Sequence, residues 1–179
     1  MMKLVLAAAA IALTLPVFAA DDRFDKKGSP ESMSGFIPAR DPLYLKECGT
    51  CHFGYSPGLM PARSWIRILD RIGNHFGESV QLDPATRAKL QAYLTSNAAD
   101  QSAYEGSKAF MERIPPANTP YRLSSVPLFK QMHTVIHEVI STKTKVKVRT
   151  VTNCNACHQK AEEGSFGLSE LYIPGLTGP

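Results

Sequence analysis

Long apolar runs are missing from this sequence after its first twenty residues. A membrane-spanning helix needs about 20 apolar residues, so no transmembrane segment is expected there. We find no internal repeat beyond a short cysteine motif, no low-complexity segment and no nucleic-acid-binding motif. The formal net charge of the chain is only +4, so charge alone indicates no class of partner.

The first twenty residues, MMKLVLAAAAIALTLPVFAA, form the one long apolar stretch. Lys3 supplies a positive start, Leu4 to Leu15 form an apolar centre, and small residues close the segment. This arrangement is typical of a secretory signal peptide, and the apolar centre is too short for a membrane anchor. We therefore predict export to the periplasm, with cleavage after Ala19 or Ala20.

The rest of the chain predicts a mainly α-helical fold. Residues 21–40 are polar with Gly and Pro, which predicts a flexible lead-in. Asp-Pro pairs at 41–42 and 83–84 are helix-start signals, because the carboxylate can cap a helix that has proline in its first turn. Apolar residues at helical spacing, from Trp65 to Phe76, predict a helix between these pairs. The expected helices of the first half cover 41–51, 62–73 and 83–97.

The second half is separated from the first by a weak helix at 108–114 and by prolines at 115, 116 and 120. We expect two small lobes, 41–105 and 106–179. In the second lobe we expect a long helix near Pro127, capped by Ser124 or Ser125. An extended basic segment, Lys143 to Val151, and a short helix from Cys154 to Glu163 should follow.

All four cysteines lie in two CxxCH motifs. This motif is the signature of covalent c-type haem attachment, in which two thiols bind the porphyrin and the histidine binds its iron. Disulfides would not require a histidine after both pairs, zinc sites have more closely spaced pairs, and a thioredoxin-like site needs a βαβ unit. We therefore predict two haem c groups, bound by Cys48, Cys51, His52, Cys154, Cys157 and His158.

The sixth ligand of each iron decides between electron transfer and ligand chemistry. Only three further histidines exist, at positions 75, 133 and 137. His75 can fold back over the first haem, and either His133 or His137 can reach the second from the apolar helix. Met60, Met111 and Met132 are rival ligands, although such methionines more often fill gaps in a core.

Four blocks of the sequence resemble the bacterial dihaem cytochrome c family: ECGTCHFGYSPGLMPARSW, NHFG, LDPATRAKLQAYL and NCNACHQKAEEGSF. The resemblance runs from about Asp41 to Pro174. It implies one bis-histidine haem in each lobe and a first lobe similar to class I cytochromes c. It also implies that His75 is the distal ligand of the first haem. The family's spacing from proline to histidine fits Pro127 and His133, although His137 continues the same helix.

The resemblance implies a role in electron transfer, and with the signal peptide we expect a periplasmic electron carrier that is not an enzyme. Six-coordinate irons leave no site for a substrate, whereas the alternative, a dihaem peroxidase, requires an open or displaceable iron site. Family members are linked to an oxygen-binding monohaem cytochrome c and a membrane cytochrome b. We therefore expect redox proteins, and not nucleic acid, as partners.

Overall fold

The computed structural model describes residues 35–142, 148 and 150–175. Within these ranges the chain forms α-helices joined by short 3₁₀ helices, with no β-strand, which confirms the mainly helical fold. The α-helices are α1 (Pro42–Cys48), α2 (Ala62–Asp70), α3 (Pro84–Ser96), α4 (Glu105–Glu112) and α5 (Pro127–Thr142). The 3₁₀ helices are η2 (Pro57–Leu59), η3 (Ile72–Asn74), η4 (Ala99–Gln101), η5 (Leu123–Ser125), η6 (Cys154–Ala156), η7 (Ala161–Glu163) and η8 (Leu168–Glu170).

Both Asp-Pro pairs start helices, as predicted. The Asp41 carboxylate accepts a hydrogen bond from the Tyr44 backbone N–H at 2.7 Å. The Asp83 carboxylate accepts hydrogen bonds from Ala85 and Thr86 at 2.9 and 3.0 Å. A proline follows each aspartate at the first helical position, where its missing N–H costs no hydrogen bond.

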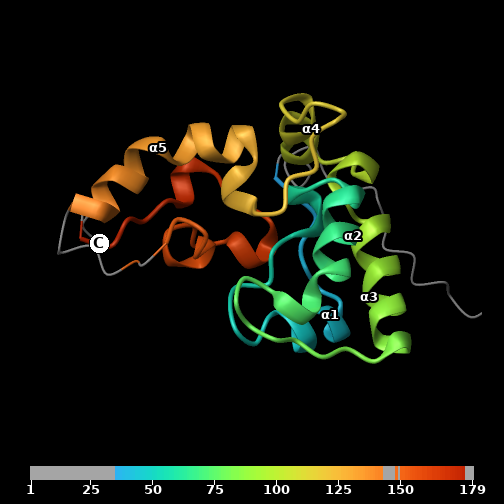
Figure 1. Cartoon of the computed structure of the whole chain (residues 1–179). Coiled ribbons are helices and arrows are strands. Elements are labelled where there is room, and N and C mark those ends of the chain that lie inside the picture. The colour runs from blue at the N-terminus through green and yellow to red at the C-terminus, as the bar shows by residue number, and fades with distance from the viewer. Residues whose placement is uncertain (1–34, 143–147, 149, 176–179) are drawn as a thin grey trace, which may run out of the picture.

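Helices α2 and α3 pack side by side (Figure 1) and supply much of the core. Trp65, Ile68 and Leu69 of α2 are buried, as the helical spacing predicted, and Leu90 of α3 is fully buried. However, α2 ends at Asp70, and η3 follows it. The apolar face therefore stops before Phe76, whose side chain is 40% exposed.

The packed structure begins earlier than the sequence predicted. Phe36, in the expected lead-in, is only 7% exposed. Its ring makes edge contacts with Phe110 of α4 and with Phe166 near the C-terminus, at centroid distances of 5.0 and 5.4 Å. Its backbone N–H donates to the Gly164 carbonyl at 2.9 Å. The segment from residue 35 therefore joins the two halves of the chain.

The expected lobe boundary near residue 105 is not marked by a change in packing. Helix α4 lies against η2 and η4 of the first half and also against α5. The hydrophobic core continues from Phe36 through Leu94 to Phe129 of α5. Figure 1 shows α5 on the opposite side of the molecule from α1 to α3, with the C-terminal segment beneath it.

Helix α5 begins at Pro127, as expected, but Val126 directly precedes it, and the Ser125 hydroxyl donates to the Arg122 carbonyl. Most of the basic segment Lys143 to Val151 lies outside the described residues. The expected helix from Cys154 to Glu163 is wrong: the chain forms η6 and η7 instead. The reason is that the backbone around His158 pairs with the C-terminal segment, in an isolated bridge to Leu171, and does not continue a helix.

We expect Gly164→Ala to lower the free energy of unfolding of the haem-loaded protein by about 1 to 3 kcal/mol. Gly164 has a positive φ of 79°, and an added Cβ would overlap the Phe36 carbonyl oxygen. Gly167→Ala is the control, because its Cβ would meet only Ser169 Oγ at 3.7 Å. Denaturant unfolding followed by circular dichroism measures both. Equal stability of the two variants would contradict this packing.

Candidate functional site

The first CxxCH motif lies at the C-terminal end of α1. Cys48 is the last residue of this helix and is half-buried, whereas Cys51 is exposed. Gly49 caps the helix by donating its N–H to the Leu45 carbonyl at 2.9 Å. A Cβ at Gly49 would lie 2.6 Å from that same oxygen, so glycine allows the close turn. His52 follows directly on the exposed side.

The second motif lies on η6. Cys154 is buried and Cys157 is half-buried. The Cys157 and His158 N–H groups both donate to the Cys154 carbonyl, at 3.1 and 2.8 Å. The Tyr172 N–H donates to the Cys157 carbonyl at 2.8 Å, so the C-terminal segment fixes the end of the motif.

The motif cysteines are not paired as disulfides within the described chain. Burial raises the pKa of the Cys48 thiol to about 11, and burial raises the pKa of Cys154 to about 12. Redox-active CxxC motifs need the opposite shift, because a lowered pKa makes the thiolate. No group of three or more His, Cys, Asp or Glu able to hold a metal ion occurs among the described residues.

The imidazole rings of His52 and His75 lie close together. Their ring centroids lie 6.1 Å apart with an angle of 28° between the planes. A coordinating imidazole nitrogen lies about 2 Å from a transition metal ion, and its ring centre about 1 Å farther out, so two imidazoles on one iron have centres roughly 6 Å apart. The observed separation fits one haem iron between these two rings.

His158 and His133 form a second pair of the same size. Their centroids lie 6.3 Å apart, with an angle of 67° between the planes. His133 comes from α5, and its Nδ1 lies 2.8 Å from the Phe129 carbonyl oxygen, one helical turn earlier. This contact leaves Nε2 as the nitrogen available to a metal. The separation again fits a single iron.

Neutral imidazole is the form that coordinates a metal. Burial, and next the neighbouring His52, lower the pKa of His75. Burial, and next His133, lower the pKa of His158. Nδ1 of both His75 and His158 is buried without a hydrogen-bond partner among the described residues. Because Nδ1 is enclosed by protein, Nε2 is the nitrogen of each ring that is left for a bound group.

The other candidates for the sixth ligand lie in positions less suited to coordinating an iron. His137 is exposed on α5 and does not line the cavity described below, whereas His133 does. Met60 is 2% exposed and packed in the hydrophobic core, and Met111 packs against that core. Met132 does line the cavity, but its side chain is largely exposed.

A mainly apolar cavity of about 330 Å³ separates α5 from the second motif. Its size lies within the range of cofactor pockets, roughly 300 to 1,000 Å³. Met132, Val135 and Leu168 line it, yet they are 64%, 74% and 84% exposed. Apolar side chains left open in this way fit a large planar apolar group that covers them.

The two motifs adjoin one another. A hollow of about 560 Å³ is lined by Cys51 and His52 of the first motif and by Asn155 of the second. Tyr55 stacks on the His52 ring, with centroids 5.0 Å apart, and its hydroxyl donates to the Thr152 carbonyl at 3.1 Å. The Tyr55 side chain thus connects His52 to the loop before Cys154.

The fold, the two motifs and the two histidine pairs define a c-type cytochrome with two haem centres. The sequence matches the family described as dihaem cytochrome c over residues 44–166. The chain belongs to this family, and its cofactors are two covalently attached haem c groups.

Solved structures of two dihaem cytochromes are similar to this chain. A dihaem cytochrome c from Rhodobacter sphaeroides is 38% identical, with a TM-score of 0.61 over 73% of this chain and 99% of that chain. A dihaem cytochrome type c from Shewanella baltica OS155 is 29% identical, with a TM-score of 0.58 over 75% of this chain and 93% of that chain. No curated protein sequence matches the chain.

Sequence reasoning missed the aromatic rings beside the histidines. Tyr55 stacks on His52, Phe76 lies 4.6 Å from His75, Phe129 stacks on His133 at 4.0 Å, and Phe166 meets the edge of His158 at 5.2 Å. Phe129 could have been found, because residues four positions apart meet on one helix face. No such spacing in the sequence points to Phe166.

We expect Tyr55→Phe to lower the free energy of unfolding of the haem-loaded protein by about 0.5 to 1.5 kcal/mol, because it leaves the Thr152 carbonyl without its donor. Tyr121→Phe is the matched control: the Tyr121 hydroxyl is buried with no partner among the described residues, so its removal should cost nothing. Urea unfolding measures both. A larger loss for Tyr121→Phe than for Tyr55→Phe would refute the assignment of this link.

Proposed function

We propose that this chain carries electrons between redox partners through two six-coordinate, bis-histidine haems. The observation that supports this most directly is the pair of histidine contacts, with ring centroids 6.1 and 6.3 Å apart. Cys48 and Cys51 would attach the first haem, with His52 and His75 as its axial ligands. Cys154 and Cys157 would attach the second, with His158 and His133.

When bound, each haem supplies a one-electron couple whose potential depends on its axial ligands and surroundings. The protein's part is to hold each imidazole still, so that no ligand is exchanged during transfer. The Phe129 carbonyl orients the ring of His133, and the Phe53 carbonyl, 2.8 Å from Nδ1, orients that of His52. Two occupied axial positions leave no place for peroxide, which favours a carrier over a peroxidase.

We place this work in the periplasm. Residues 1–20 read as a signal peptide cleaved after Ala19 or Ala20. None of the helices among the described residues combines the length and apolarity of a membrane span. For partners, we propose an oxygen-binding monohaem cytochrome c and a membrane cytochrome b, as the family resemblance implies.

His75→Ala and His133→Ala should each convert one haem from low to high spin, because each removes one axial ligand. His137→Ala is the matched control from the same helix as His133, and both haems should stay low-spin. The ferric absorption spectrum, recorded with and without carbon monoxide after reduction, measures the change. High-spin iron in His137→Ala with none in His133→Ala would reverse the assignment on α5, and high-spin iron in the unaltered protein would favour the peroxidase.

The ferric protein should give two different low-spin electron paramagnetic resonance signals. The imidazole planes of the first pair are 28° apart and those of the second 67°. Nearly parallel planes separate the two iron orbitals that they overlap, whereas nearly perpendicular planes leave them close in energy and make the signal more anisotropic. The more anisotropic signal should disappear in His133→Ala and the other in His75→Ala. Two identical signals would contradict the ring geometry.

A further inference from the structure

His75 lies at the start of a tight turn. Its N–H donates to the Glu78 carbonyl at 2.7 Å, and the Glu78 N–H donates back at 3.1 Å. The two residues between them, Phe76 and Gly77, have positive φ angles of 57° and 104°. This is the backbone of a type I′ turn, which glycine and asparagine favour. A phenylalanine there is strained, so contacts of its ring must hold it.

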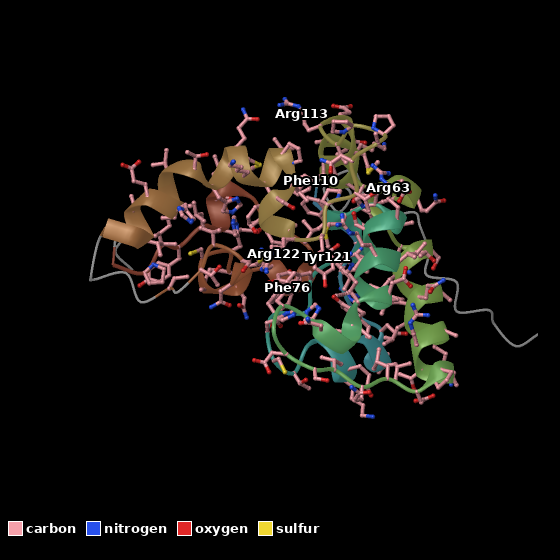
Figure 2. The ribbon with its side chains drawn as sticks, viewed as in Figure 1. Arg63, Phe76, Phe110, Arg113, Tyr121 and Arg122 are labelled. Carbon is pink, nitrogen blue, oxygen red and sulfur yellow. The ribbon has the colours of Figure 1, made fainter. Side chains whose placement is uncertain are left out.

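Those contacts come from a distant part of the chain. The Arg122 guanidinium carbon lies 3.9 Å from the centre of the Phe76 ring. The Tyr121 ring also packs on Phe76, with centroids 4.8 Å apart. Figure 2 shows Arg122, Tyr121 and Phe76 gathered at one place, beside the turn and below α4. A guanidinium at this distance attracts the face of the ring.

The segment that carries Arg122 is itself fixed to α2. Arg67 donates to the Thr119 carbonyl at 2.6 Å. The guanidinium carbons of Arg67 and Arg71 lie 5.4 and 5.7 Å from the centre of the Tyr121 ring. Tyr121 and Arg122, which contact Phe76, therefore belong to a segment that is anchored to α2, a helix of the core.

Arg122 places a positive charge over the Phe76 ring. No carboxylate lies within ion-pair distance of it among the residues that the structure describes. Arg122 lies over the ring of Phe76, whose centre is 4.6 Å from that of His75, so its positive charge is close to this imidazole. A nearby cation favours the state with one more electron, so the same charge would favour the reduced iron.

We propose that Arg122 is a positioning residue for the first haem centre, which holds His75 in place through Phe76 and raises the reduction potential of that haem. The inference rests on the proposed role of His75 as an axial ligand. Arg122 would act in two ways: its planar guanidinium stacks on the Phe76 ring, and its charge acts on the iron of the first haem. Lysine keeps the charge without the planar group, so substitutions can separate the two.

The test uses the haem-loaded full chain with Arg122→Gln, Arg122→Lys and Phe76→Leu. Arg113→Gln is the matched control: it removes the same charge, but its guanidinium bonds Gln131 at 3.1 Å, far from Phe76 (Figure 2). A redox titration followed by paramagnetic resonance gives the potential of each haem. The rate of carbon monoxide binding after reduction reports how easily His75 is displaced.

We expect Arg122→Gln to lower the potential of one haem only and to speed carbon monoxide binding about two- to fivefold. Arg122→Lys should keep the reduction potential of the unaltered protein, but carbon monoxide should still bind faster than it does to the unaltered protein. Phe76→Leu should speed binding by a similar factor, with no further increase in the double variant, because both residues belong to one contact. Arg113→Gln should change neither.

Unchanged potentials and unchanged binding in Arg122→Gln would overturn the proposal, even if the variant were less stable to urea, because the contact would then be only structural. An equal fall in both potentials, shared by Arg113→Gln, would also overturn it, since the effect would be one of net charge. The role of His75 is tested separately: if His75→Ala leaves the first haem low-spin, the axial assignment itself fails.

Discussion

In the proposed bis-histidine coordination, the separation of two imidazoles, about 6 Å between ring centres, is the constraint on which the rest of this structure depends. The four histidines come from four different places: after α1, after η3, on α5 and after η6. An iron tolerates only small errors in ligand distance, so each of these segments must be held firmly. The carbonyl oxygens of Phe53 and Phe129 and the isolated backbone bridges at His75 and His158 provide this.

The helices of this fold are short, which makes it difficult to hold the histidines in exact positions. Helix α5, the longest, has 16 residues, and α1 has 7, so most of these helices would be marginal alone. They are stabilised by contacts between distant segments: Phe36 between Phe110 and Phe166, and Tyr55 against the loop before Cys154. A haem bound in the cavity beside α5 would add to this stability, because it would cover apolar surface such as that of Val135 and Leu168.

Features that depend on residues near one another in the chain could be predicted from the sequence. These are the helix starts at the Asp-Pro pairs, the haem motifs, and the buried face of Trp65, Ile68 and Leu69. The 3₁₀ turns after Cys154 could not be predicted, because they depend on pairing with Leu171 and Tyr172. Nor could the burial of Phe36 or the stacking of Arg122 on Phe76, which join segments far apart in the chain. That His133 lines the cavity beside the second motif and His137 does not could not be predicted from their shared helix either.

The central claim is that each iron lies between two imidazoles. X-ray absorption at the iron edge of the ferric protein tests it most directly, because sulfur and nitrogen neighbours scatter differently. We expect six nitrogen neighbours for both irons, four from the porphyrin and two from histidines, with no sulfur. A sulfur neighbour from a methionine, or an average coordination number below six, would contradict it.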